Sequence, residues 1–454
     1  MPVTQDLIAS SANRVVFGLG PTGLSVARFL HRHGESFAVV DTRSEPPCLA
    51  ELRSEMPEVP VFTGEIPEQV LAGAGQLIVS PGVALEEQHV AAAIEVGVPV
   101  AGDVDLFVAA AEAPVVGITG SNAKSTVTAL VGEMVSAAGQ NAGVGGNLGT
   151  PALELLEEGR DLYVLELSSF QLERAGRLDL ELATVLNVSA DHLDRHGSMP
   201  RYHQAKHRIF RGCRTAVVNR DDPLTMPLVD DTVRVITWGM GEPDIDHYGL
   251  RQLDGIEFLC RGFDPLIAVD ALPLPGRHNV ANALAALAIA EGINIPMHDR
   301  LAGIGRFRGL PHRCELVAQA RGVRWVNDSK GTNVGATLAA LEGLGGDHNL
   351  VLLAGGQGKG ADFAALAGAL AKHGRLLITF GEDAAAIDRA LSGSVTTRRA
   401  ASLEEAVTMA GEAAQSGDTV LLSPACASFD MFNSYTDRGD RFSALARRAA
   451  EGGA

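Results

Sequence analysis

The chain of 454 residues is too long for one ordinary hydrophobic core, and its length is typical of about three domains. Its formal net charge of -18 excludes general nucleic-acid binding, which needs a basic surface to displace counterions from phosphates. Hydrophobic residues make up 46% of the chain, but no uninterrupted apolar run reaches the roughly 18 to 20 residues of a membrane span. We therefore expect neither a nucleic-acid nor a membrane partner.

The N-terminal stretch MPVTQDLIAS lacks the basic start and long apolar segment of a signal peptide. Scattered cysteines without C-x-x-C spacing argue against a disulfide framework or a zinc site and fit a reducing, cytoplasmic location. The chain has five of them: Cys48, Cys213, Cys260, Cys314 and Cys426.

Short β-branched runs alternate with alanine-rich stretches, as in NRVVFGLG followed by LSVARFLHRHG. This alternation is typical of βαβ units and mostly parallel sheets. A strand closes and a helix begins within VPVAGDVDLF, and a second break is expected near RFRGLPHR, after the helix ANALAALAIAEG. We therefore predict three α/β domains, at residues 1–101, 102–308 and 309–454.

The motif GLGPTG begins at Gly18, after the strand VVF, and opens a predicted helix. The next strand, FAVVDTR, carries Asp41 where a Rossmann unit places the acid that contacts a ribose. Glycines in such a loop let the backbone approach a pyrophosphate at a helix N-terminus, where unpaired N–H groups favour an anion. NAD and a nucleotide sugar both fit, and a ligand-free turn is the structural alternative.

The stretch GITGSNAKST lies between an apolar strand and a predicted helix, where a phosphate-binding loop would lie. It departs from the strict Walker A pattern, because Ile118 and Ala123 stand where that pattern has glycine. Lys124 can still reach a phosphate, and Ser125 or Thr126 can offer a hydroxyl to Mg²⁺. Phosphate binding is favoured over a purely structural turn.

Acidic and imidazole side chains follow the next two predicted strands. The strand in DLYVLELSSFQLE ends on Glu166, and the strand predicted over ATVLNVSADH ends near Asp191 and His192. Beside a phosphate loop, such groups suit Mg²⁺ coordination. Further on, RYHQAKHRIF carries Lys206 on a probable helix, for which spacing alone favours a solvated basic face.

The last predicted domain repeats a strand followed by a small or charged turn four times, in RWVNDSKGTN, NLVLLAGGQGKGADF, LLITFGED and TVLLSPACASFDMF. If these strands are parallel, their turns gather along one sheet edge, where open α/β sheets bind ligands. Lys330 and Lys359 there would suit a small anionic substrate. Glycine turns needed only for packing would not explain these lysines.

These motifs, in this order, resemble those of the Mur ligases of peptidoglycan precursor synthesis over essentially the whole chain. The most specific stretches are TGSNAKST, GGNLGTP, LELSSFQLE, NVSADHLDRH, YHQAK, HNVANALAAL, GLPHR, NDSKGTN, GGQGKGADF and LSPACAS. The resemblance implies a Rossmann-like UDP-sugar-binding domain, a central P-loop-type ATPase domain with a mostly parallel sheet, and a Rossmann-like C-terminal domain that binds the amino acid.

The best-matching family pattern implies an ATP-dependent amide ligase whose substrates are ATP, UDP-N-acetylmuramoyl-L-alanine and D-glutamate, acting through an acyl phosphate. It favours UDP over NAD at GLGPTG. Positions matching the UDP-sugar site are Thr22, Asp41, Thr42, Arg43, Ser80, Pro81, Gly82 and Asn147. Positions matching the ATP site are Gly120, Ser121, Asn122, Ala123, Lys124, Ser125, Thr126, Asn279, Arg313 and Asp328.

The resemblance further implies two Mg²⁺ ions, one held by Ser125 and Glu166 and the other by His192 with a CO₂-derived carbamate on Lys206. Lys124, His192 and Lys206 would then be the catalytic residues. Glutamate would be held by Lys330, Thr332, Lys359, Ser428, Phe429 and Tyr435. Two positions depart from the family pattern, Ala123 in place of Gly and Gln357 in place of Asp.

Two alternatives stay open on the residues alone. Folylpolyglutamate synthase and the sibling Mur ligases share the ATP loop, although GLGPTG with DTR, and DSKGTN with SPACAS, favour the D-glutamate-adding pattern. Outside the ligases, a nucleotide-sensing or NAD-binding regulator without ligase chemistry would carry similar loops. Substrate-dependent phosphate release separates a ligase from such a regulator.

Overall fold

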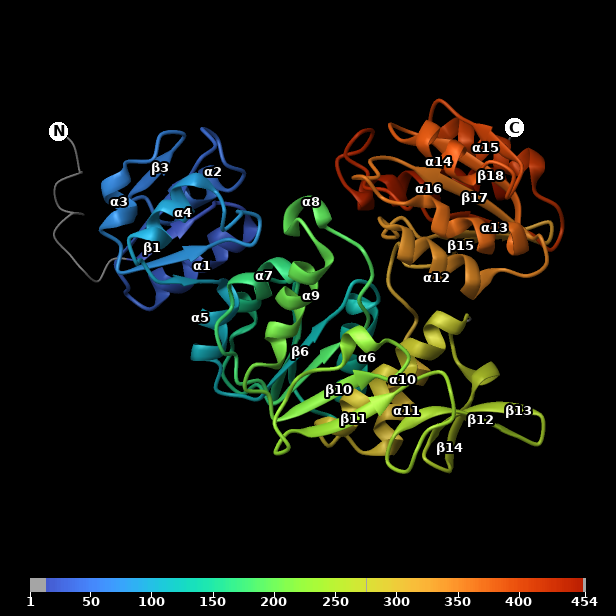
Figure 1. Cartoon of the computed structure of the whole chain (residues 1–454), viewed down its shortest axis with the longest axis horizontal. Helices are drawn as coiled ribbons and strands as arrows, with labels where there is room; N and C mark the ends of the chain where they lie inside the picture. Colours follow the sequence, from blue (N-terminus) through green and yellow to red (C-terminus); the bar gives the residue numbers. More distant parts are fainter. Residues whose placement is uncertain (1–13, 275, 452–454) are drawn as a thin grey trace.

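The computed structural model describes residues 14–274 and 276–451. The N-terminal stretch MPVTQDLIAS, which is not expected to be a signal peptide, lies outside these residues. Three α/β lobes follow one another along the chain, as Figure 1 shows. The predicted three-domain α/β architecture with mostly parallel sheets is therefore confirmed.

The first lobe contains a parallel five-stranded sheet in the order β3-β2-β1-β4-β5. Because the chain leaves β1 in one direction and returns beside it as β4, the loops after β1 and β4 meet at the switch point where such sheets bind ligands. The strands are β1 (Arg14–Phe17), β2 (Phe37–Asp41), β3 (Val61–Thr63), β4 (Gln76–Val79) and β5 (Val100–Ala101). The helices are α1 (Pro21–Arg32), α2 (Leu49–Glu55), α3 (Glu68–Ala72) and α4 (Gln88–Glu95).

The second lobe contains a nine-stranded sheet in the order β14-β13-β12-β11-β10-β9-β6-β8-β7, antiparallel only where β13 pairs with β12 and β14. Its strands are β6 (Val115–Thr119), β7 (Ala142–Gly146), β8 (Leu162–Glu166), β9 (Leu182–Val185), β10 (Thr215–Asn219), β11 (Arg234–Trp238), β12 (Tyr248–Leu253), β13 (Ile256–Arg261) and β14 (Asp264–Ala268). Its helices are α5 (Asp103–Ala110), α6 (Lys124–Ala137), α7 (Ser169–Arg174), α8 (Leu193–His196), α9 (Met199–His207), α10 (Arg277–Gly292) and α11 (Met297–Arg306).

One strand prediction in this lobe was too long. The strand predicted to end near Asp191 and His192 is β9, which ends at Val185. The backbone beyond it bonds to the phosphate-loop segment instead of to a neighbouring strand, since Ser121 N donates to the carbonyl of Asn187 at 2.9 Å. Asp191 and His192 therefore lie on an irregular segment held against that loop.

The third lobe contains a six-stranded sheet in the order β15-β16-β20-β17-β18-β19. The four strands predicted to be parallel are β16, β17, β18 and β20, and their pairing is parallel. The strands are β15 (Glu315–Ala320), β16 (Val323–Asn327), β17 (Leu350–Gly355), β18 (Gly374–Phe380), β19 (Thr397–Arg399) and β20 (Thr419–Leu422). The helices are α12 (Val334–Leu344), α13 (Ala367–His373), α14 (Ala384–Leu391), α15 (Leu403–Ala413) and α16 (Tyr435–Glu451).

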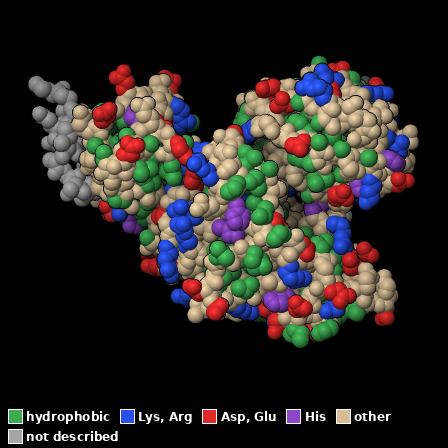
Figure 2. All heavy atoms as spheres, in the orientation of Figure 1, with side chains coloured by type: hydrophobic (Ala, Val, Ile, Leu, Met, Phe, Trp, Pro, Cys, Tyr) green, Lys and Arg blue, Asp and Glu red, His purple; other side chains and the backbone are tan. Residues whose placement is uncertain are grey.

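The first and third lobes stand on opposite sides of the central one, and Figure 2 shows a notch between them. The domain boundaries after residues 101 and 308 stay predictions, and the three sheets draw their strands from residues 14–101, 115–268 and 315–422. No helix in the part of the chain that the structure describes is long and apolar enough to cross a membrane.

The first lobe packs on the central lobe through a shared apolar cluster. Leu24 and Phe29 of α1, Phe107 of α5 and Leu153 of the short 3-10 helix at Ala152–Leu155 are buried in the same cluster. Burial of apolar side chains contributes roughly 1.5 to 3 kcal/mol each for the larger residues. This packing holds the first lobe against the central one.

Ala123 is the residue just before α6 and has φ +67° and ψ -8°, in the left-handed region. A Cβ atom disfavours this region, which glycine enters freely. Alanine, which stands where the resembling family pattern has glycine, therefore keeps the loop conformation but strains the backbone.

We predict that Ala123→Gly stabilises the central lobe by about 1 kcal/mol, because glycine removes the left-handed penalty. The change should leave turnover nearly unchanged. Thermal unfolding followed by calorimetry measures it, and Ala129→Gly, within α6, is the matched control that should lower the unfolding temperature because glycine weakens a helix interior. Equal decreases for both variants would contradict the strain at Ala123.

Candidate active site

Two lysines meet at the loop between β6 and α6. Lys124 Nζ donates to the carbonyl oxygens of Gly120 and Ser121, both at 2.9 Å. Lys206 Nζ, from α9, donates to the same Gly120 oxygen at 2.8 Å. Two ammonium groups thus converge on one carbonyl oxygen of the predicted phosphate loop.

Lys206 is buried, with 1% of its surface exposed, so the solvated helix face favoured by spacing alone is wrong for this residue. Its ammonium lies 4.5 Å from the centre of the Tyr202 ring, and Tyr202 Oη lies 3.0 Å from Ser121 Oγ. Burial lowers the pKa of Lys206 well below its usual value, and the charge of Lys124 lowers it further. Burial also lowers the pKa of Lys124.

A buried carboxylate lies beside the loop. Ser125 Oγ donates to Glu166 Oε2 at 2.5 Å, and Asn147 Nδ2 donates to Glu166 Oε1 at 2.7 Å. Glu166 is 2% exposed and has no salt bridge to any described residue. From the third lobe, Arg313 Nη2 reaches Ser125 Oγ at 2.6 Å. A buried carboxylate with only neutral partners is a suitable place for a cation.

His192 and Asp191 lie on the segment after β9. Asp191 Oδ2 accepts a hydrogen bond from Asn333 Nδ2 at 2.9 Å and lies 3.5 Å from His192 Nε2. Asn333 Nδ2 also reaches Asn122 Oδ1 at 3.2 Å. Burial lowers the pKa of His192, and the charge of Lys359 contributes to the same shift. The third lobe therefore contacts both the phosphate loop and the His192 segment.

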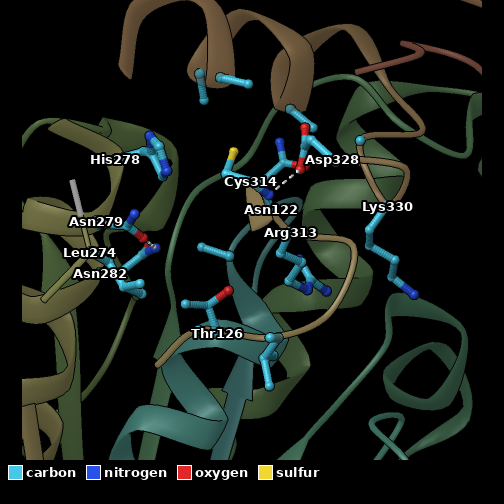
Figure 3. A pocket seen from close by; sticks show the side chains of 17 residues that line it. Asn122, Thr126, Leu274, His278, Asn279, Asn282, Arg313, Cys314, Asp328 and Lys330 are labelled. Carbon is cyan, nitrogen blue, oxygen red and sulfur yellow. Dashed lines mark hydrogen bonds between the residues drawn. The ribbon is translucent and has the colours of Figure 1, made fainter. Parts of the chain in front are cut away.

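A pocket lies between the central and third lobes and is lined in part by the phosphate loop (Figure 3). Of the residues predicted for ATP, it is lined by Asn122, Ala123, Thr126, Asn279, Arg313 and Asp328. His278 and Asn282, from the same HNVAN segment as Asn279, line it as well and were missed. Their spacing, at one residue before and three after Asn279, is the signal that could have found them.

Asp328 is buried in the wall of this pocket. Its Oδ2 accepts a hydrogen bond from Ser423 Oγ at 2.7 Å, and its Oδ1 accepts one from Cys314 N at 3.2 Å. Burial raises the pKa of Asp328 to about 6. Its charge therefore changes just below neutral pH.

A second pocket, of about 640 Å³, lies over the switch point of the first sheet. Asp41 is buried there, and its carboxylate accepts hydrogen bonds from Leu19 N at 2.7 Å and from Arg43 Nη2 at 2.6 Å. Ser80 Oγ donates to the carbonyl of Gly18 at 2.7 Å, which joins the loops after β1 and β4. The residues predicted for the UDP-sugar that line this pocket are Thr22, Asp41, Thr42, Arg43, Ser80, Pro81 and Gly82. Asn147 lies elsewhere, against Glu166.

The residues predicted for glutamate lie at the carboxyl edge of the third sheet. Lys330 Nζ lies 3.8 Å from the centre of the Tyr435 ring, and Thr332 N bonds to the carbonyl of Lys330 at 2.8 Å. Lys359 is exposed with φ +50°, on the turn after β17. Ser428 is buried, whereas the neighbouring Phe429 is 67% exposed.

Arg438 of α16 lies beneath these turns and was missed by the sequence analysis. It is fully buried, and its Nη2 donates to the carbonyls of Ser329 at 2.8 Å and Cys426 at 3.2 Å. Its Nη1 approaches the carbonyl of Gly355 at 3.4 Å. One guanidinium thus joins the turns that carry Lys330, Lys359 and Ser428.

The chain is similar to known families and proteins over most of its length. Residues 12–102 match the Mur ligase MurD-like N-terminal domain, residues 118–290 the Mur ligase middle domain, and residues 312–426 the Mur ligase glutamate ligase domain. The chain is 52% identical over 439 residues to the UDP-N-acetylmuramoylalanine--D-glutamate ligase of Pseudomonas aeruginosa, covering 96% of this chain and 98% of that protein. The ligase of the same name from Marinobacter nauticus is 50% identical, with 97% and 99% covered.

Solved structures with the same fold are more distant in sequence. UDP-N-acetylmuramate-alanine ligase MurC from Thermotoga maritima is 18% identical with a TM-score of 0.59, covering 95% of this chain and 98% of that one. MurF ligase from Thermotoga maritima, in complex with ADP, is 16% identical with a TM-score of 0.60, covering 99% and 100%. At these identities the likeness concerns the fold.

We predict that Asp328 gives the folded protein a pH-dependent stability. Because its folded pKa is raised to about 6, its contribution is fully present below the unfolded value and is lost as pH rises through about 6. Asp328→Asn should therefore raise the unfolding temperature, relative to the parent, more at about pH 8 than at about pH 5. Thermal unfolding at both pH values measures this. Asp347→Asn, whose side chain is 98% exposed, is the control, and a pH-independent difference for Asp328→Asn would refute the assignment.

Proposed function

We infer that the chain, which belongs to the Mur ligase family, is an ATP-dependent ligase that joins D-glutamate to UDP-N-acetylmuramoyl-L-alanine in peptidoglycan precursor synthesis. The observation that carries this inference is the identity of 50% and 52% to ligases named for this reaction, over 97% and 96% of the chain. A sibling ligase is less well supported, since MurC and MurF share the fold at 18% and 16% identity. We propose that this reaction takes place in the cytoplasm.

The chemistry requires activation of a carboxylate, which is a poor acyl donor. The γ-phosphoryl group of ATP is transferred to the alanyl carboxylate, which gives an acyl phosphate and ADP. The amine of D-glutamate, after losing a proton, attacks the acyl carbon, and the tetrahedral intermediate collapses to the amide and phosphate. Lys124 would compensate the charge that spreads over the phosphoryl oxygens during transfer.

The nucleotide would occupy the pocket between the central and third lobes. Its phosphates would lie on the loop from Gly120 to Thr126, where α6 begins without a side-chain cap hydrogen bond and its first N–H groups would meet the anion. Asn279 would contact the adenine end. Arg313 and Asp328 would approach from the third lobe, so that nucleotide binding would draw the two lobes together.

Mg²⁺ fits the residues around Glu166. Ser125 and Glu166 supply the oxygen ligands that this ion prefers, and the Glu166 carboxylate has only neutral hydrogen-bond partners. His192, with Lys206, would hold a second ion. When bound, Mg²⁺ would neutralise phosphate charge and polarise the transferring group. Asn147 would fix the orientation of Glu166 as well as contacting the muramoyl part.

Lys206 is proposed to carry a carbamate. Its nitrogen would attack CO₂ and release one proton, which replaces a buried ammonium beside Lys124 with a carboxylate-like group. The position suits this change, because burial and the charge of Lys124 already disfavour the ammonium. The resulting oxygens would face the phosphate loop, where a metal ligand is required.

The UDP-sugar would bind over the first sheet at Thr22, Asp41, Thr42, Arg43, Ser80 and Gly82, and glutamate at the carboxyl edge of the third sheet. Glutamate has two carboxylates, and the chain's net charge is -18, so its site must be locally positive. Lys330 and Lys359 supply that charge, and Thr332, Ser428, Phe429 and Tyr435 would complete the pocket.

We expect phosphate release only when ATP, UDP-N-acetylmuramoyl-L-alanine and D-glutamate are all present, with L-glutamate and other amino acids reacting much less. Holding both carboxylates would direct the amine of the opposite enantiomer away from the acyl phosphate. Steady-state phosphate release across a panel of amino acids is the test. A nucleotide-binding regulator would give no substrate-dependent release.

In the same assay, Lys359→Ala should raise the KM for D-glutamate about ten- to hundredfold, since a lost charge-assisted hydrogen bond costs about 1.5 to 3 kcal/mol. The KM for ATP should change little. Lys372→Ala, on an exposed position of α13, is the matched control. An unchanged KM for D-glutamate would remove Lys359 from the proposed site.

Replacing Lys206 by alanine should abolish most turnover, and formate or acetate should restore part of it by supplying the missing carboxylate. Lys124→Ala should also be inactive but should not respond to either acid, because it removes a cation. Turnover measured over a range of formate concentrations distinguishes the two. Parent-like activity of Lys206→Ala without added acid would exclude the carbamate.

A further inference from the structure

Arg174, the last residue of α7, crosses from the central lobe to the first lobe. Its side chain is completely buried. Nη1 donates to the carbonyls of Val79 at 3.1 Å and Ser80 at 2.6 Å, and Nη2 to those of Pro81 at 3.4 Å and Val83 at 3.0 Å. Nε donates to the carbonyl of Phe170 within α7 at 2.9 Å. The five N–H groups of the guanidinium thus match five carbonyl oxygens.

The four carbonyls of the first lobe belong to the end of β4 and the segment that follows it. This segment lines the pocket assigned to the UDP-sugar, through Ser80, Pro81, Gly82 and Val83. Ser80 in turn holds the carbonyl of Gly18 at 2.7 Å. Arg174 therefore holds one wall of that pocket and, through Ser80, the loop that begins GLGPTG.

A second arginine continues the connection toward the other end of the substrate. Arg195 of α8 donates from Nη2 to the carbonyl of Val83 and to Glu173 Oε2, both at 2.9 Å. Glu173 also lies 3.5 Å from Arg174 Nη2. The helix α8 starts directly after His192, whose carbonyl accepts from Arg195 N at 3.1 Å. The connection thus runs from the wall of the first pocket to the His192 segment.

Contacts within the central lobe also hold α7 and α8 together. His196 Nε2 lies 3.0 Å from Ser169 Oγ at the start of α7, and the Phe170 ring lies 4.8 Å from that of His192. The ends of α7 and α8 are therefore joined to each other as well as to the first lobe. A shift of the Val83 segment would be transmitted to the residue next to the reacting groups.

We propose that Arg174, supported by Glu173 and Arg195, is a positioning residue that sets the spacing between the UDP-sugar pocket and the phosphoryl-transfer site. This rests on the proposed function, in which one substrate must reach from the first pocket to the γ-phosphate of ATP. A displacement of about 1 Å between reacting groups can reduce the rate about a hundredfold, so this spacing must be fixed before the substrate binds. The shared apolar cluster holds the lobes together, and the guanidinium, with its directional bonds, fixes one loop within that contact.

The test compares Arg174→Met, which keeps the length of the side chain but removes its donors, with Arg28→Met. Arg28 bonds to Glu154 at 3.2 Å across the same pair of lobes, on the surface, and serves as the matched control. Arg174→Met should lower kcat/KM for UDP-N-acetylmuramoyl-L-alanine about ten- to hundredfold and leave the KM for ATP and for D-glutamate within about twofold. Arg28→Met should match the parent.

Arg195→Met removes one of the two bonds to Val83 together with the bond to Glu173, and it keeps the assay decisive if Arg174→Met fails to fold. Arg195→Met should also lower kcat/KM for UDP-N-acetylmuramoyl-L-alanine, by a smaller factor than Arg174→Met. Calorimetric binding of the UDP-sugar in the absence of ATP gives a readout independent of turnover and should be weakened in both arginine variants. If the parent itself releases no phosphate, the proposed function fails. The positioning role is wrong if the parent is active and both variants change the kinetic parameters for all three substrates equally. It is also wrong if neither variant changes any of these parameters.

Discussion

The carbonyl oxygen of Gly120 accepts hydrogen bonds from two ammonium groups, the partly buried Lys124 at 2.9 Å and the buried Lys206 at 2.8 Å. Two like charges this close, shielded from water, raise the free energy of the folded chain unless an anion joins them. The arrangement is therefore unfavourable by itself and favourable with a phosphate beside Lys124 or a carboxylate on Lys206. The other features of the site follow from this concentration of charge: Glu166 lies beside the loop, the pocket leads away from it, and the third lobe contacts it through Asn333 and Arg313.

Each lobe brings its ligand pocket to the carboxyl edge of a parallel sheet, and the distances between those edges decide whether three anionic substrates can react. The first and central lobes are joined by a common apolar cluster and by Arg174, so their spacing is largely built in. The third lobe contacts the phosphate loop mainly through side-chain hydrogen bonds, such as that from Arg313 to Ser125. Bonds of this kind exchange readily with ligand groups, whereas buried apolar surface does not. On the proposed function, the UDP-sugar substrate would therefore lie across the fixed contact, and the nucleotide would lie across the adaptable one.

The fold and most candidate site residues could be predicted from the sequence because they follow strand ends. Parallel strands place their carboxyl ends on one edge, so Glu166, Lys330 and Lys359 could be placed from the chain alone. Residues whose partners are backbone carbonyls could not be predicted in this way. Arg174 and Arg438 bond to carbonyl oxygens from segments distant in sequence, and a carbonyl carries no signal of residue type. The buried position of Lys206 was missed for a related reason, since the packing of α9 against the loop, and not its spacing of basic residues, decides which face is covered.

Several cations of this acidic chain differ in what neutralises them. Arg234, Arg261 and Arg300 all bond to the carboxylate of Glu291, which also accepts from Tyr248, and this network joins α10 to the antiparallel end of the central sheet. Each of these arginines therefore has a carboxylate partner within the fold, and Arg261 also pairs with Asp246, so they serve its structure. Lys124, Lys206 and Arg438 bond instead to carbonyl oxygens, and none has a salt bridge to a carboxylate among residues 14–274 and 276–451. A carbonyl solvates a cation without cancelling its charge, so the field of these three groups remains available to an incoming anion. A chain with a net charge of -18 can in this way keep locally positive sites for phosphate and carboxylate groups while its surface stays acidic.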